Sequence, residues 1–144
     1  MFRLVELTYN GEKEIPAIYP YENKDALEGD FEFKLGSALE NNADELLIAF
    51  DEFGNVIFNA KVGTYEFLPR LYEAKFTTEE IADLIKCDTV ELAHARFHKR
   101  KGNAIKDNEC VQEVLYGFDG NGNPLDFCRW VRTVEPVEPE EPQE

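Results

Sequence analysis

Apolar and polar residues alternate along the start of the chain, which is typical of a half-buried strand. This pattern covers residues 2–9, and the Asn10-Gly11 pair that follows is a typical hairpin turn. Residues 14–22 should return in an extended conformation, because two prolines within them bar a helix. The chain is therefore predicted to open with a β-hairpin.

The next stretch changes to helical spacing. Asn23 is a suitable N-cap for a helix over residues 24–41. Gly29 and Gly36 inside it each cost about 1 kcal/mol relative to alanine, so we expect close packing there against another backbone. The apolar positions that recur at helical spacing and should face inward are Leu27, Phe31, Leu35, Ala38 and Leu39.

A second hairpin should follow the helix. Residues 46–51 and 55–62 are rich in β-forming side chains and are separated by a turn at residues 52–54. The first part of the chain is therefore predicted to be a β-β-α-β-β unit.

The same pattern then returns, since residues 2–62 and 69–131 match with small gaps. Sixty-six places on, Phe31, Gly36, Ala38 and Asn42 recur as Phe97, Gly102, Ala104 and Asn108. A lone unit of about 65 residues would bury only about 60% of its unfolded surface, so two units should pack together. The sequence predicts a duplicated, self-paired scaffold.

The second unit contains one conflict between local and repeat signals. Residues 77–85 have good helix propensity, but their counterpart is extended, so we predict a strand at residues 80–87. A helix should then start at Asp88, with Glu91 completing a capping box. Its expected inward residues are Leu92, Ala93, Phe97, Ala104 and Ile105.

The predicted fold class is α+β: two pseudo-symmetric ββαββ units with antiparallel sheets backed by two helices. The units comprise residues 1–66 and 67–133 and pack as one domain. Residues 134–144 are rich in proline and glutamate and should form an acidic, disordered tail.

The amino-acid composition argues against several classes of function. The net charge of −15 argues against binding to nucleic acid or to anionic membranes. There is no apolar run of about 18 residues and no signal-peptide pattern. Three cysteines without Cys-x-x-Cys spacing indicate a reducing compartment and no zinc site.

The two helices carry opposite charges at matched positions. Glu28 and Glu32 correspond to His94 and His98, and residues four apart share a helix face. If a pseudo-two-fold axis brings the helices together, these patches could face each other and favour pairing within the chain. The alternative is that both are ordinary solvated faces.

A dense basic cluster on the second helix is the main candidate interaction site. It could bind phosphate or an acidic partner, or it could be a charged, exposed helix face. A helix-turn-helix is disfavoured, because residues 86–88 make a poor turn. The cluster consists of Arg96, Lys99, Arg100, Lys101 and Lys106.

No pattern in the chain identifies a reaction. His94-x-x-x-His98 has metal-pair spacing but lacks the adjacent glutamate and a third ligand. Residues 119–123 imitate the start of a calcium loop, but Pro124 and Trp130 stand where glycine and glutamate are needed, so we predict a turn. We expect no catalytic residue, metal or cofactor.

Short motifs resemble a type of small protein from tailed phages and prophages of gut bacteria. Tyr9-Asn10-Gly11, the stretch 31–38 and the stretch 97–104 (Phe-His-Lys-Arg-Lys-Gly-Asn-Ala) carry the resemblance. It implies a small, non-enzymatic phage accessory or virion-associated protein that acts by protein–protein contact, in the host cytoplasm or the virion. The alternative is an acidic inhibitor of a basic host enzyme, and a homo-oligomer is possible.

Overall fold

The computed structural model describes residues 2–76, 80–106 and 112–133. In these residues the first unit contains β1 (Phe2–Tyr9), β2 (Glu14–Tyr21), α1 (Lys24–Glu40), β3 (Asp44–Phe50) and β4 (Val56–Val62). The second unit contains β5 (Arg70–Phe76), β6 (Glu80–Lys86), α2 (Val90–Lys106), β7 (Gln112–Phe118) and β8 (Pro124–Thr133). The predicted α+β class and the two ββαββ units are confirmed.

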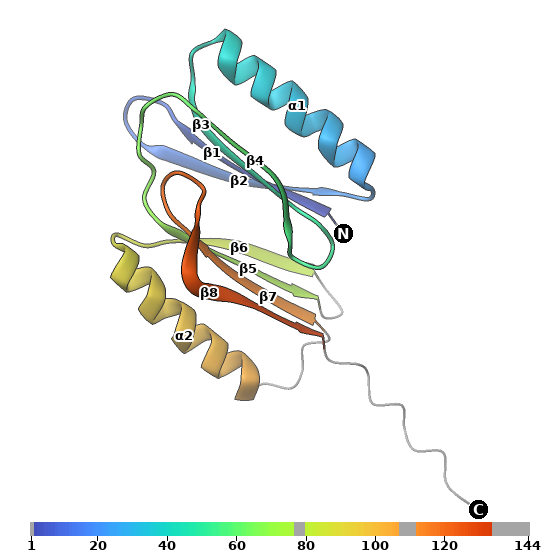
Figure 1. The fold of residues 1–144 in the computed structure, drawn as a ribbon, viewed down its shortest axis with the longest axis vertical. Coiled ribbons are helices and arrows are strands. Elements are labelled where there is room, and N and C mark those ends of the chain that lie inside the picture. Colours follow the sequence, from blue (N-terminus) through green and yellow to red (C-terminus); the bar gives the residue numbers. More distant parts are fainter. Residues whose placement is uncertain (1, 77–79, 107–111, 134–144) are drawn as a thin grey trace, which may run out of the picture.

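Each unit forms its own antiparallel sheet. The strand orders are β2-β1-β3-β4 and β6-β5-β7-β8, which are the same order in equivalent strands. The two sheets pack face to face, and each helix covers the outer face of its own sheet (Figure 1). The molecule is therefore a four-layer sandwich with helices outside and sheets inside.

Three apolar layers hold this sandwich together. In the middle layer, β3 contributes Leu46, Ile48 and Phe50, which pack against residues of β5 and β7 such as Tyr72. Leu47 and Ala49 point the other way and pack under α1. Because period-two alternation puts apolar residues on both faces, the central strands are buried on both sides.

The contact between the units is reciprocal. Gly54, in the turn between β3 and β4, approaches Val114 so closely that an added Cβ would lie 2.6 Å from its Cγ1. Gly122, in the equivalent turn of the second unit, approaches Leu46 in the same way, with 2.8 Å to its Cδ1. Each partner occupies the matching position of the other unit, so the interface has the symmetry of a two-fold dimer.

The two matching turns are built by the same side chain. Asp51 Oδ1 accepts hydrogen bonds from the backbone N–H groups of Phe53 and Asn55, both at 2.8 Å. Asp119 Oδ1 accepts the equivalent bonds from Asn121 and Asn123, at 2.9 and 3.0 Å. The prediction that residues 119–123 form a turn is confirmed.

The two helices do not meet. They lie on opposite outer faces of the sandwich, and α1 and α2 share no contact among the described residues (Figure 1). The hypothesis that Glu28 and Glu32 face His94 and His98 across an axis is therefore wrong. The physical reason is that the sheets, with an apolar inner face each, occupy the centre.

Local helix predictions need two corrections. Leu39 and Ile105, expected to face inward, are 59% and 53% exposed. Ala38 and Ala104 take the buried position in the last turn, so the following residue points about 100° away from the sheet. Helix α2 is capped by Thr89, whose Oγ1 accepts the Leu92 N–H at 3.0 Å, instead of by Asp88.

Other local predictions agree with the structure. Asn23 caps α1 by accepting the Ala26 N–H at 2.8 Å. The strand expected at residues 80–87 is β6, despite its helical propensity. The predicted tail at residues 134–144 lies outside the described residues.

A buried ion pair joins the two units. Arg70 Nη2 lies 3.3 Å from Glu14 Oε1, and the two side chains are only 3% and 4% exposed. The same Glu14 oxygen accepts the Leu68 N–H at 2.9 Å. Burial lowers the pKa of Arg70, and the nearby Glu14 charge opposes that shift.

We expect Glu14→Ala to lower the free energy of unfolding by about 3–5 kcal/mol, because it leaves the Arg70 charge buried without this partner. Urea unfolding monitored by circular dichroism measures it. Glu12→Ala, an exposed residue of the same hairpin, should change stability by less than about 0.5 kcal/mol. Equal effects of the two substitutions would contradict the role of the pair.

Replacing two different glycines by alanine should change the free energy of unfolding in opposite directions. Gly29 and Gly36 have nothing within 4 Å of an added Cβ, so the predicted close packing of α1 there is wrong.

Gly36→Ala should therefore raise the unfolding free energy by roughly 0.5–1 kcal/mol. Gly54→Ala should lower it by about 1–3 kcal/mol, because φ is +80° and Val114 blocks the methyl group. Thermal and urea unfolding of both variants would decide this.

Candidate functional site

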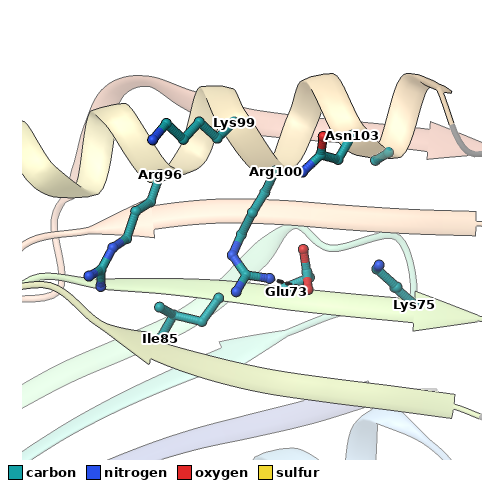
Figure 2. A pocket seen from close by; sticks show the side chains of 8 residues that line it. Glu73, Lys75, Ile85, Arg96, Lys99, Arg100 and Asn103 are labelled. Carbon is teal, nitrogen blue, oxygen red and sulfur yellow. Dashed lines mark hydrogen bonds and ion pairs between the residues drawn. The ribbon is translucent and has the colours of Figure 1, made fainter.

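A groove runs between α2 and strands β5 and β6, on the outer side of the second sheet (Figure 2). Its volume is about 510 Å³. Four cationic side chains and one carboxylate line it, together with the apolar Ile85 of β6 and Ala104 of α2. The remaining lining residues are Glu73, Lys75, Arg96, Lys99, Arg100 and Asn103. We call it the α2 groove.

Two arginines of the α2 groove are held in place by hydrogen bonds. Arg96 Nη1 donates to the Lys86 carbonyl oxygen at 2.9 Å. Arg100 Nη1 donates to Glu73 Oε1, also at 2.9 Å, and both side chains reach down from the helix toward the strands (Figure 2). A guanidinium has five donors, so each keeps further donors for a ligand.

Lysines add positive charge at the two sides of the groove. Lys75 Nζ lies 4.0 Å from Glu113 Oε1, a carboxylate that is fully buried below it. Lys99, on α2, is exposed to solvent. Counting Lys75, Arg96, Lys99 and Arg100 against Glu73 and Glu113, the site carries two net positive charges on a chain of net charge −15.

The structure divides the predicted basic cluster. Arg96, Lys99 and Arg100 come together in the α2 groove, whereas Lys101 does not line it. His94 contacts another part of the sheet, with its Nδ1 3.1 Å from Cys128 Sγ on β8. His98 is exposed.

The acidic counterparts Glu28 and Glu32 are exposed on α1. They therefore lie on the opposite outer face of the sandwich from the α2 groove (Figure 1).

The histidines do not converge with other ligands. In the described part of the chain, no group of three or more His, Cys, Asp or Glu side chains could hold a metal ion. The Cys128 thiol beside His94 is 1% exposed, and burial, followed by the charge of Asp126, raises its pKa. Such a thiol stays protonated near neutral pH and is a poor nucleophile.

The first unit has an equivalent groove with different electrostatics. It lies beside α1, has a volume of about 180 Å³, and we call it the α1 groove. Its lining residues are Glu6, Phe33, Lys34, Ser37 and Glu45. In the second unit the equivalent positions, 66 to 68 residues further on, are Glu73, Lys99, Arg100, Asn103 and Glu113.

Two carboxyl groups, Glu6 and Glu45, lie in the α1 groove beside one lysine. Glu6 Oε2 lies 3.5 Å from Lys34 Nζ, and Glu6 Oε1 accepts the Tyr19 hydroxyl at 3.2 Å. Burial raises the pKa of Glu45 to about 8, and its hydrogen bond to Glu6 and the Glu6 charge add to the effect. Glu45 is therefore protonated at pH 7 and hydrogen-bonded to Glu6.

Sequence reasoning missed the residues that the strands contribute to both grooves. Lys75 and Glu73 were not singled out, nor were Glu6 and Glu45. Alternation along β5 does place Glu73 and Lys75 on the same face as Leu71, which packs under α2. The face they share depends on which side α2 covers, and that is a tertiary property.

Comparisons with known proteins add no family. No protein-family model, curated protein or solved structure matches the chain. None of the helices in the described residues has the length and apolar character needed to cross a bilayer.

The proton on Glu45 predicts a specific pH dependence. Its pKa is about 8 in the folded state against 4.5 ordinarily, so the folded state binds the extra proton. The contribution of this bound proton to the free energy of unfolding is fully present below pH 4.5 and is lost as pH rises through about 8. The difference in unfolding free energy between wild type and Glu45→Gln should thus fall across this window. Glu28→Gln, at an exposed carboxylate, should give a flat difference, and urea unfolding at several pH values measures both.

Proposed function

We propose that this protein is a non-enzymatic phage accessory or virion-associated protein that acts by protein–protein contact, and that the α2 groove binds an acidic segment of its partner. The observation that carries the proposal is the concentration of Lys75, Arg96, Lys99 and Arg100 in one groove of an otherwise acidic protein. The phage context rests on the resemblance of the motifs around Tyr9 and residues 97–104.

The groove suits a carboxylate-bearing segment for three reasons. Arg96 and Arg100 are already oriented, which reduces the entropy lost when a carboxylate binds. Lys99 and Asn103 are exposed and can adjust to the ligand. Ile85, which is partly exposed, offers apolar surface to the side-chain stems of the partner.

Electrostatics should shape the partner's approach. The negative field of the whole protein repels an acidic partner at long range, and the groove attracts it at short range. Specific contact therefore requires a partner whose acidic segment stands out from its own surface. This arrangement favours selectivity over affinity.

A second candidate function is an acidic inhibitor that occupies the basic site of a host defence or nucleic-acid enzyme. The observation that favours it is the exposed acidic side of α1, where Asp25, Glu28, Glu32 and Glu40 face solvent. In this case the contact surface would be the α1 side, and the α2 groove would be dispensable.

Charge reversal can separate the two candidates. Lys99→Glu should weaken capture of the partner about tenfold, roughly 1.4 kcal/mol, because it places a negative charge in the α2 groove. The matched control is Lys13→Glu, which makes the same charge change at the exposed β1–β2 turn. The measurement is a tagged pull-down from the native producing cells at low and high salt, with the captured proteins quantified by mass spectrometry.

Outcomes are distinct for each candidate. A phage structural protein lost with Lys99→Glu and kept with Lys13→Glu supports the α2 groove. A basic enzyme kept with Lys99→Glu but lost with a Glu28→Lys/Glu32→Lys double variant supports the inhibitor. Equal capture by all variants would contradict both.

A further inference from the structure

Carboxyl groups at equivalent positions of the two units have different cationic partners. Under α2, Glu73 pairs with Arg100 at 2.9 Å and Glu113 has Lys75 at 4.0 Å. Under α1, the equivalent Glu6 pairs with Lys34 at 3.5 Å. The difference lies at the second carboxyl group of each pair.

Strand register shows two positions that differ beside this carboxyl group. Lys75 on β5 and Arg132 on β8 are the direct cross-strand partners of Glu113 on β7, and Lys75 lies within ion-pair distance of it. At the equivalent positions of the first unit, Thr8 on β1 and Val62 on β4 are the partners of Glu45 on β3. Neither residue can supply a positive charge there, and Glu45 retains a proton instead.

The groups that face Glu45 do not include a cation equivalent to Lys75. From β1 it faces Glu6, and from α1 it faces Lys34, whose ammonium group favours the ionised form of Glu45. From β2 the Tyr19 hydroxyl is occupied by Glu6, and Asp30 of α1 accepts from the Tyr21 hydroxyl. From β4 its cross-strand partner is the uncharged Val62. An additional cation at Glu45 would therefore give it a partner of the kind that Glu113 has in Lys75.

Space for such a cation exists in the α1 groove. The groove of about 180 Å³ is lined by both carboxyl groups, with Ser37 of α1 beside them. Phe33, also in the lining, is 74% exposed and offers an apolar surface to an alkyl chain. A lysine side chain, an ammonium group on a four-carbon stem, has the matching chemistry.

We propose that the α1 groove binds the ammonium group of a lysine side chain from a protein partner, in the role that Lys75 fills within the second unit. The second unit is the independent observation, because the same two carboxyl positions there pair with side-chain cations. This site is separate from the α2 groove and does not depend on the function proposed for it.

Binding is coupled to release of one proton. Before binding, the protonated Glu45 adds no charge to the ion pair of Glu6 with Lys34. The incoming ammonium group displaces the Glu45 proton to solvent, and two carboxylates then face two cations. The charge of the site is unchanged, so the energetic cost of burying the new cation is offset by the ionised Glu45.

The experiment is an NMR titration of the full chain at pH 7 with Nα-acetyl-lysine methylamide, with its Nε-acetylated counterpart as the uncharged control. Carbon signals of the glutamate carboxyl groups report the ionisation of Glu45. We expect a saturable shift at Glu45 and Phe33 with the charged probe, and a lower pH midpoint for Glu45 in its presence. Spermidine, titrated in parallel, tests a free polyamine as the source of the ammonium group.

Three variants make the result specific. Thr8→Lys should lower the Glu45 midpoint without any probe and abolish the probe response, because the new side chain reproduces Lys75. Thr8→Val, similar in shape to threonine, should keep both the high midpoint and the response. Glu45→Gln should lose the response while folding normally, since it retains a neutral side chain.

The proposal is overturned if the probe leaves the Glu45 midpoint unchanged, or if Thr8→Lys and wild type respond alike. Equal shifts with the acetylated probe would also overturn it, because they would show contact through the backbone or stem. Spermidine binding more than about tenfold tighter than the lysine probe would overturn the assignment to a protein partner. If a pull-down shows no role for Lys99 while Thr8→Lys behaves as expected, this inference stands and the α2-groove proposal fails.

Discussion

The constraint on which this structure depends is that each sheet has two apolar faces and both must be covered. In β3, Leu46, Ile48 and Phe50 point to one side while Leu47 and Ala49 point to the other. One helix per unit can cover only one face of its sheet. The other face is covered by the sheet of the second unit, which is why a single unit would be incomplete and why the chain carries two.

That arrangement also explains where the grooves form. A helix packed across the central strands leaves the outer strand of the sheet less covered, so a hollow remains along one flank of α1 and of α2. Polar side chains of the inner strand, Glu6 in one unit and Glu73 in the other, lie in that hollow and require partners. The helix supplies a cation to each, Lys34 or Arg100, at equivalent positions. The scaffold thus creates two equivalent polar sites on opposite sides of the molecule.

These two equivalent sites differ in charge. The α2 groove has cations in excess, whereas in the α1 groove one lysine faces two carboxyl groups, one of which stays protonated. Outward positions differ in charge, such as Phe33 against Lys99 and Thr8 against Lys75. Buried positions differ as well, such as Leu27 against Ala93, but both residues are apolar. The outward differences therefore change the charge beside each helix, and the two units present different surfaces.

The sequence by itself determined the elements, their order, the two-fold repeat and the turns, because these depend on local spacing and on side chains such as Asp51 and Asp119 that bond within five residues. It also indicated a basic cluster on α2, of which Arg96, Lys99 and Arg100 line one groove. Only the tertiary structure decided that the helices lie apart, that Leu39 and Ile105 face solvent, and that Lys75 lies beside Glu113. These depend on which face of each sheet is covered and on strand register, which are set by contacts between residues far apart in the chain.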